Sequence, residues 1–310
     1  MEKSYNETPN NFEEVLPYVI TDPNAIAREI LRHTKCYFYD TCAFRKYAEL
    51  ANPVPVFEHI RGNGGMVLLT RCVLMELCSG DGSLWQRHIR FLTQMSEAGI
   101  PVCIMYEEDT WNVLNFYYRE NNEINQCLTY AIRSAKNSVG TVQQTLDEAP
   151  ELKKEVLSGT YNRSGTLFRR FFKAVRANKE SGDNLGEELI AIVMHLLSNI
   201  PEMTEYKYIL LTEDKGAIAQ LQKVMENVRL YMGKACITAL TSAKLAQLLY
   251  FEEWIKEPEQ MEDFLRQGND GDQIRVYCAD KYELGVIFRT YSCRELAQKI
   301  CGQEDFRIFF

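Results

Sequence analysis

Short apolar runs rich in β-branched and aromatic residues recur along the first 240 residues, and longer stretches of helical periodicity separate them. Such runs are typical of buried strands, whereas apolar residues that recur every three to four positions are typical of amphipathic helices. The runs predict strands at 36–40, 66–70, 101–105, 206–212 and 234–240. The periodic stretches predict helices at 23–33, 42–50, 71–78, 83–98, 185–198, 215–225 and 242–250.

The order of these elements is typical of a doubly wound α/β domain. Strands that alternate with helices form a parallel sheet covered by helices on its faces. We therefore expect residues 1–250 to form an α/β fold with a mainly parallel five-stranded sheet. Residues 106–182 interrupt the alternation, and we expect them to form a helical insertion, because structureless connections of that length are rare in compact domains.

The last part of the chain has a different pattern. After Trp254 it becomes acidic and polar, and it then carries two strand-like runs, IRVYC and GVIFRTY, a helical stretch CRELAQKIC and a final apolar run FRIFF. This order predicts a small β-β-α-β appendage in residues 251–310. The pattern indicates no function for it.

Composition restricts the class of protein. No run approaches the roughly 18 consecutive apolar residues of a membrane-spanning helix, and MEKSYNETPNNFEEV lacks the basic and then apolar order of a secretory signal. The ten cysteines include no C-x-x-C pair, which argues against a zinc site. We expect a cytoplasmic protein with no membrane partner, whose cysteines are mostly free thiols of the core.

The charge is unevenly distributed. A net charge of −8 argues against a protein that coats nucleic acid. Residues 161–179, however, contain six basic residues and no acidic one. With phenylalanines between them, these residues could bind a single strand by phosphate pairing and base stacking. The alternative is an ordinary amphipathic helix with a solvated basic face. The candidate nucleic-acid contacts are Arg163, Arg169, Arg170, Lys173, Arg176 and, farther along, Lys215.

Acidic residues follow two of the predicted strands. Asp40 ends the first strand, and Asp214 follows the fourth. Ligands of a doubly wound sheet bind beyond the carboxyl ends of its strands. If the two strands are neighbours, both carboxylates therefore converge there. Glu76 is a third candidate, because it interrupts an otherwise apolar stretch after the second strand, and a buried charge needs a partner.

Two more acids begin the helix predicted at 185–198. Asp183 and Glu187 are four residues apart, where like charges repel mildly, and a cation would remove that conflict. Taken singly, these acids can be helix caps or partners of the helix dipole. Taken together, they are the oxygen ligands that a hard divalent cation such as Mg²⁺ or Mn²⁺ requires.

Four motifs, in chain order, resemble those of PIN-domain nucleases: CYFYDTCAF, RCVLMELCSG, GDNLGEELIAIVMHLL and YILLTEDKGAIAQL. The last is the most specific, since the family has a strand that runs into Thr-x-Asp-Lys-Gly, as residues 212–216 do here. The resemblance covers about residues 30–250, apart from the insertion. It implies an acidic quartet of metal ligands, Asp40, Glu76, Glu187 and Asp214, and a supporting hydroxyl from Thr212. Asp183 is either a fifth ligand or the third ligand in place of Glu187.

The resemblance also implies an activity. PIN-domain proteins are metal-dependent endoribonucleases, so we expect Mg²⁺ or Mn²⁺ to activate water for attack on single-stranded RNA. A catalytically silent binding module and a toxin-type nuclease held by an inhibitory protein partner stay open, as does a homodimer. A haloacid-dehalogenase-type phosphatase fits less well, because it requires an acid two residues after the nucleophile, where this chain has Cys42.

Overall fold

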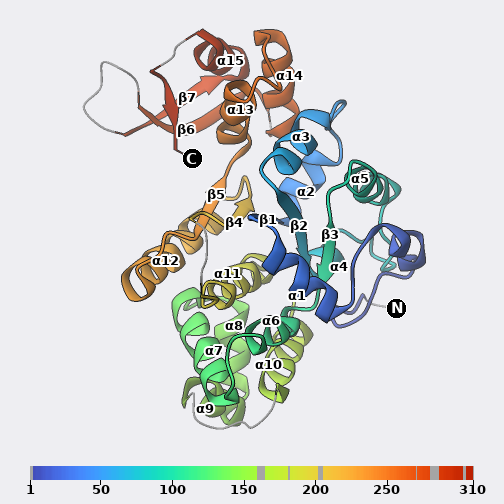
Figure 1. The fold of residues 1–310 in the computed structure, drawn as a ribbon, viewed down its shortest axis with the longest axis vertical. Helices are drawn as coiled ribbons and strands as arrows, with labels where there is room; N and C mark the ends of the chain where they lie inside the picture. The colour runs from blue at the N-terminus through green and yellow to red at the C-terminus, as the bar shows by residue number, and fades with distance from the viewer. Residues whose placement is uncertain are drawn as a thin grey trace.

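A parallel sheet forms the centre of the protein (Figure 1). The computed structural model describes residues 3–158, 165–180, 182–201, 205–269, 271–279, 286–302 and 305–309. Within them a five-stranded sheet has the order β3-β2-β1-β4-β5, and all its neighbouring strands are parallel. The strands are β1 (Lys35–Tyr39), β2 (Gly65–Thr70), β3 (Val102–Met105), β4 (Tyr208–Leu211) and β5 (Ile237–Leu240). The predicted α/β class is therefore confirmed, as are the five strands.

Helices cover this sheet. They are η1 (Phe12–Glu14), η2 (Leu16–Tyr18), α1 (Pro23–Arg32), α2 (Thr41–Tyr47), α3 (Val54–Gly62), α4 (Arg71–Glu76), α5 (Gln86–Glu97), α11 (Leu185–Leu197), α12 (Lys215–Met232) and α13 (Ser242–Phe251). Helix α3 was not predicted; it begins after Pro53 and contains Pro55, and proline is tolerated in a first turn. Helix α12 is longer than predicted and ends at Gly233, whose φ of 65° is left-handed.

The predicted helical insertion is also present. It comprises η3 (Glu107–Asp109), α6 (Thr110–Asn115), α7 (Asn121–Ala135), α8 (Thr141–Glu148), α9 (Pro150–Ser158) and α10 (Thr166–Ala177). Helix α7 packs against α11 and α12, and α10 packs against α8 and α9. Figure 1 shows α7–α10 gathered at the end of the molecule opposite the C-terminal elements. The insertion therefore extends the α11 side of the domain.

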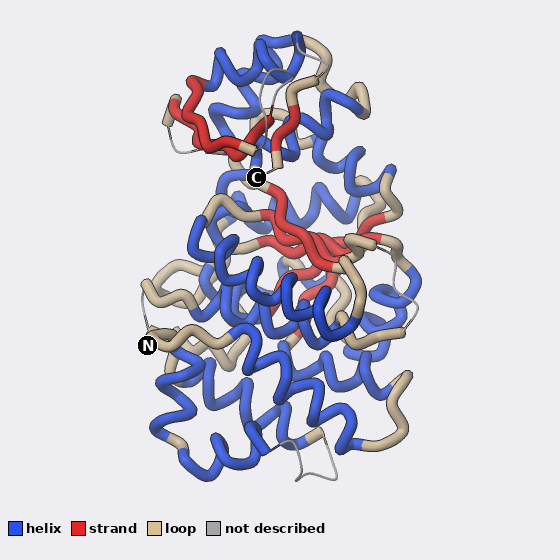
Figure 2. The backbone as a smooth tube through the Cα atoms, turned by 90° about the vertical axis from the view of Figure 1, so that its left-hand side faces the viewer, coloured by secondary structure: helices blue, strands red, loops and turns tan. Residues whose placement is uncertain are grey.

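The C-terminal elements form a second, antiparallel sheet, which Figure 2 shows apart from the central one. Its strand order is β7-β6-β8. The elements are α14 (Pro258–Gly268), β6 (Gln273–Ala279), β7 (Ile287–Ser292), α15 (Cys293–Gly302) and β8 (Arg307–Ile308). They follow the predicted β-β-α-β order. Helix α14 is an addition, and its helically spaced Met261, Phe264 and Leu265 are buried.

The strand order determines where a site can form. β1 pairs with β2 on one side and with β4 on the other, so the direction in which successive strands are added reverses at β1. A ligand crevice is expected at such a reversal, beyond the carboxyl ends of the strands. Asp40 and the segment after β4 lie at that edge, and the Asp40 N–H donates to the Leu211 carbonyl at 3.2 Å. Among the described residues, none of the helices has the length and apolar character needed to cross a bilayer.

Candidate metal centre

The ends of β1 and β4 are joined by side chains. The Thr212 hydroxyl donates to Asp40 Oδ2, and the same hydroxyl oxygen accepts the Asp214 N–H at 2.9 Å. Thr212 is fully buried and stands next to Asp40 in register, because Tyr39 pairs with Leu211. Thr212 therefore orients Asp40 and the turn that carries Asp214, as a supporting hydroxyl should.

Asp40 and Asp214 also begin helices. Asp40 Oδ1 accepts the Ala43 N–H at the start of α2, and Asp214 Oδ1 accepts the Ala217 N–H at the start of α12. Burial raises the pKa of the Asp40 carboxyl, hydrogen bonds from Thr212 and the Ala43 N–H oppose the rise, and the negative charge of Asp214 adds to it. The two carboxylates are thus close enough to repel each other.

Glu187, in the first turn of α11, faces the same charges. Burial, and after it the negative charges of Glu76, Asp40 and Asp214, together raise the pKa of this carboxyl to about 7. Its Oε2 atom is buried and has no hydrogen-bond partner. Glu187 also lines a cavity of about 230 Å³, together with Gly216 of α12. A carboxylate oxygen without a partner, in the field of other carboxylates, is suited to a cation.

Glu76 ends α4 and lies against the start of α11. A methyl group on Gly186 would lie 2.9 Å from Glu76 Oε2, so glycine lets α11 approach this carboxylate closely. The Thr41 hydroxyl donates to Glu76 Oε2, and the Lys179 ammonium lies 2.9 Å from Glu76 Oε1. Glu76 therefore belongs to the group around Glu187 but already has a cationic neighbour.

Asp183 has several partners of its own. Its carboxylate is paired with Lys179, and it accepts the Thr141 hydroxyl at 2.9 Å and the Leu185 N–H at 3.1 Å. Burial alone would raise the pKa of Asp183, but these hydrogen bonds leave it below the ordinary value. Asp183 thus connects α11 to Lys179 and α8, and it is not among the charges that raise the pKa of Glu187.

The structure therefore brings Asp40, Glu187, Asp214 and Glu76 together and directs Asp183 to Lys179. Among the described residues, no three acidic, histidine or cysteine side chains are close enough together to form a metal-binding group. Asp40 and Asp214 use one oxygen each to cap a helix. The four carboxylates are suitable ligands for a hard divalent cation, which would need them to turn towards it. The cavity at Glu187 is lined by Lys136 and Lys223 and by none of the other three acids.

The candidate nucleic-acid contacts are divided. Arg169, Arg170 and Lys173 of α10 are exposed, whereas Arg163 lies outside the described residues. The phenylalanines between them, Phe168, Phe171 and Phe172, are fully buried, so they do not offer rings to a base. This burial favours the alternative in which α10 is an ordinary amphipathic helix. Lys215 is exposed at the start of α12.

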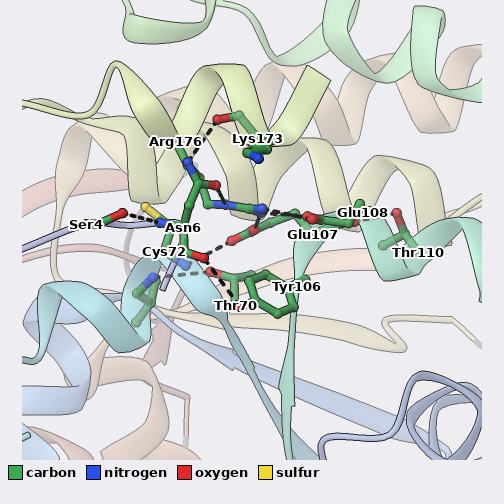
Figure 3. A network of polar contacts seen from close by, with 11 residues as sticks. Ser4, Asn6, Thr70, Cys72, Tyr106, Glu107, Glu108, Thr110, Lys173 and Arg176 are labelled. Atoms are coloured by element: carbon green, nitrogen blue, oxygen red, sulfur yellow. Dashed lines mark hydrogen bonds and ion pairs between the residues drawn. The ribbon is translucent and has the colours of Figure 1, made fainter. Parts of the chain in front are cut away.

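Arg176 is a structural residue (Figure 3). Its side chain is 1% exposed, and its guanidinium is paired with Glu107 and with Glu108, where the two Nη–Oε distances are 2.7 and 2.9 Å. Arg176 Nε donates to Asn6 Oδ1 at 3.1 Å, and Glu107 also accepts the Cys72 N–H at 3.0 Å. Arg176 therefore connects α10 to η3, to α4 and to the N-terminal segment.

Several residues of the site were not predicted from the sequence. Lys179 is the last residue of the basic segment 161–179, yet its side chain is buried between Glu76 and Asp183, which raise its pKa above the ordinary value although burial opposes this. Cys42 donates its thiol to Asp40 at 3.1 Å. Glu213 accepts the Ser242 N–H at the start of α13, and burial raises the pKa of this carboxyl to about 7. Cys42 could have been recognised from the sequence, because it lies two residues after Asp40.

Comparison of the chain with protein-family models, with curated proteins and with solved structures found no match in any of the three. The resemblance to PIN-domain nucleases therefore stays a prediction from the four motifs.

Proposed function

We propose that this protein is a metal-dependent nuclease that hydrolyses phosphodiester bonds of RNA at the carboxyl edge of its central sheet. Asp40, Glu187 and Asp214 would hold Mg²⁺ or Mn²⁺, with Glu76 as a further ligand. Asp183 is better suited to position Lys179 than to bind the cation directly, because it already accepts hydrogen bonds from Lys179, Thr141 and Leu185.

One observation carries the proposal: Glu187 Oε2 is buried, lacks a hydrogen-bond partner and belongs to a carboxylate whose pKa is raised by burial and by three other acids. The Lys179 ammonium neutralises part of the charge of Glu76, but the repulsion among the four acids is still unfavourable where they are buried. A divalent cation would keep all of these carboxylates ionised and would satisfy the unpaired oxygen.

The chain's own residues have distinct roles in this proposal. Thr212 orients Asp40 and the turn at Asp214, and the first turns of α2 and α12 hold one oxygen of each aspartate. Lys179 neutralises part of the negative charge of Glu76. When bound, the cation would lower the pKa of a water molecule and stabilise the charge that develops on the phosphate.

RNA as the substrate follows from the resemblance of the four motifs to PIN-domain nucleases. A catalytically silent binding module and a toxin-type nuclease held by an inhibitory partner use the same fold, so activity has to be measured directly. The raised pKa of Glu187 favours the enzyme, because acids with shifted pKa values are frequent in functional sites.

The test is cleavage of a fluorescent single-stranded RNA in Mn²⁺ or Mg²⁺ by wild type, Asp40→Asn, Glu187→Gln and Asp214→Asn. We expect each variant to lower kcat/KM by at least about 100-fold, because direct metal ligands matter more than the residues that orient them. Glu97→Gln is the matched control: Glu97 is an exposed acid at the end of α5, near the opposite edge of the sheet.

Equal cleavage by wild type and the three variants would reject the site. Cleavage by none of them in either metal, with folding intact by circular dichroism, would favour the silent binding module. An RNA substrate that is cut only after a bound protein is removed would indicate the toxin-type alternative.

A further inference from the structure

We propose that the solvent face of the C-terminal sheet is a stacking surface for single-stranded RNA, which it delivers to the carboxyl edge of the central sheet. This inference deepens the proposed function and rests on it. It assigns a role to the appendage and names unpaired bases as the feature that the protein recognises.

Three aromatic side chains form a row across this sheet. Residues of β6 alternate between exposed and buried, and Tyr277 is on the exposed face. Tyr277 pairs with Phe288 of β7, and the Phe309 N–H donates to the Tyr277 carbonyl at 2.8 Å on the other side. Because directly opposite residues in antiparallel strands share a face, the three rings lie side by side. We call Tyr277, Phe288 and Phe309 the aromatic row.

The aromatic row is not part of the core. Its three side chains are 48%, 49% and 43% exposed, whereas Val276 and Ile308, on the opposite face, are fully buried. The rings of Tyr277 and Phe288 have centroids 4.9 Å apart and planes tilted by 47°. About half of each residue is exposed to solvent all the same. Adjacent exposed rings on an antiparallel sheet are a means by which proteins stack unpaired bases.

Positive charge accompanies the aromatic row. The Lys215 ammonium lies 5.8 Å from the Phe288 ring centroid. Arg275 is exposed on the same face of β6, two residues before Tyr277. Aromatic rings with cations beside them match the two parts of a single strand, bases and phosphates. This charge complementarity favours a polynucleotide over an apolar protein segment.

A groove extends from the aromatic row to the residues on either side of Asp214 in the chain. It has a volume of about 710 Å³. Its lining includes the three rings and Arg275 of the C-terminal sheet, and Glu213, Lys215 and Thr241 from the segments after β4 and β5. Asp214 lies between Glu213 and Lys215 in the chain. A strand stacked on the aromatic row would therefore lead its backbone to the carboxyl edge.

The experiment measures binding separately from cleavage. Fluorescence anisotropy in EDTA follows a labelled ten-nucleotide oligouridine RNA on the full chain. We expect Tyr277→Ala and Phe288→Ala each to weaken binding by about tenfold, the effect of losing one stacked base. Phe288→Leu, which keeps apolar area but no aromatic face, should not restore binding, and Phe288→Trp should. Lys215→Gln should reduce the slope of log K against log salt by about 0.7.

The control is Tyr231→Ala, because Tyr231 is 79% exposed near the far end of α12 and should leave binding unchanged. Wild-type affinity in Tyr277→Ala and Phe288→Ala would overturn the inference, as would full rescue by Phe288→Leu or competition by duplex RNA as strong as by the single strand. Wild-type binding by these variants together with loss of cleavage in Asp40→Asn would overturn the stacking surface and leave the nuclease intact. Aromatic-dependent binding without cleavage in either metal would reject the nuclease alone.

Discussion

Glu107 and Glu187 both belong to groups of acids near the carboxyl ends of the central strands, and they differ in their partners. Glu107 follows β3 and is fully buried, but it is paired with Arg176, and its other oxygen accepts the Cys72 N–H. Glu187 has an unpaired oxygen and faces other carboxylates. A buried charge with complete partners holds a fold together, whereas one without them is available to a ligand. Burial alone therefore does not distinguish structure from function; the partners do.

The largest effect on stability is expected from breaking the ion pair between Arg176 and Glu107. Arg176→Met leaves Glu107 buried without its cation, so we expect the free energy of unfolding to fall by about 3–5 kcal/mol. Arg169→Met, on the exposed face of the same helix, should change it by less than about 0.5 kcal/mol. Thermal and urea unfolding of both variants measure this. Equal stabilities would mean that the Arg176 network does not stabilise the fold.

A second variant removes a cation from the acids near Glu187. Lys179→Met removes the cation shared by Glu76 and Asp183, so both carboxylates lose this ionic partner and keep only their hydrogen bonds. We expect a loss of about 2–3 kcal/mol in EDTA, because both acids are largely buried. Millimolar Mn²⁺ should recover more stability in this variant than in wild type. The opposite order in Mn²⁺ titrations followed by calorimetry would argue against a cation at this place.

In the wild type, metal binding by the acids around Glu187 should stabilise the protein. Mn²⁺ at about 100 times its dissociation constant should stabilise the protein by about 2.7 kcal/mol. Glu187→Gln should lose most of that gain. Glu188→Gln is the matched control, since Glu188 is the adjacent acid on α11 and also has an oxygen without a partner. Its other oxygen accepts the Val142 N–H of α8, and Asp40 and Asp214 are not among the charges that raise its pKa. If both variants keep the Mn²⁺ response, the cation binds elsewhere.

The smallest effect concerns Asp109, next to the paired glutamates. Burial and then the charge of Glu108 raise the pKa of Asp109 from 3.8 to about 6. The folded protein thus holds this proton more tightly than the unfolded chain, and stability is lost as pH rises from about 4 to about 6. Asp109→Asn should therefore gain about 1 kcal/mol at pH 7, allowing for partial exposure, and almost nothing near pH 4. A pH-independent gain in unfolding experiments would reject this assignment.

The central sheet and its edge were predictable because they depend on local pattern. Apolar runs predict the strands, and Asp40 and Asp214 follow two of them directly. The partners of Arg176 and Lys179 were not predictable, because Glu107 and Glu76 are distant in the chain and only the fold brings them near. Helix α14 was missed because its acidic residues obscure three apolar positions at helical spacing. The aromatic row depends on strand register, which the sequence alone did not provide.

The pairing of β1 with β4 has a consequence for how the chain is made. β1 ends at Tyr39, but its neighbour β4 begins only at Tyr208, after the whole insertion has been synthesised. At the usual rate of translation the interval is on the order of ten to thirty seconds. During that time the most central strand of the nascent protein has an open edge that can pair wrongly or attract chaperones. Completion of the sheet is therefore one of the later events in the protein's synthesis.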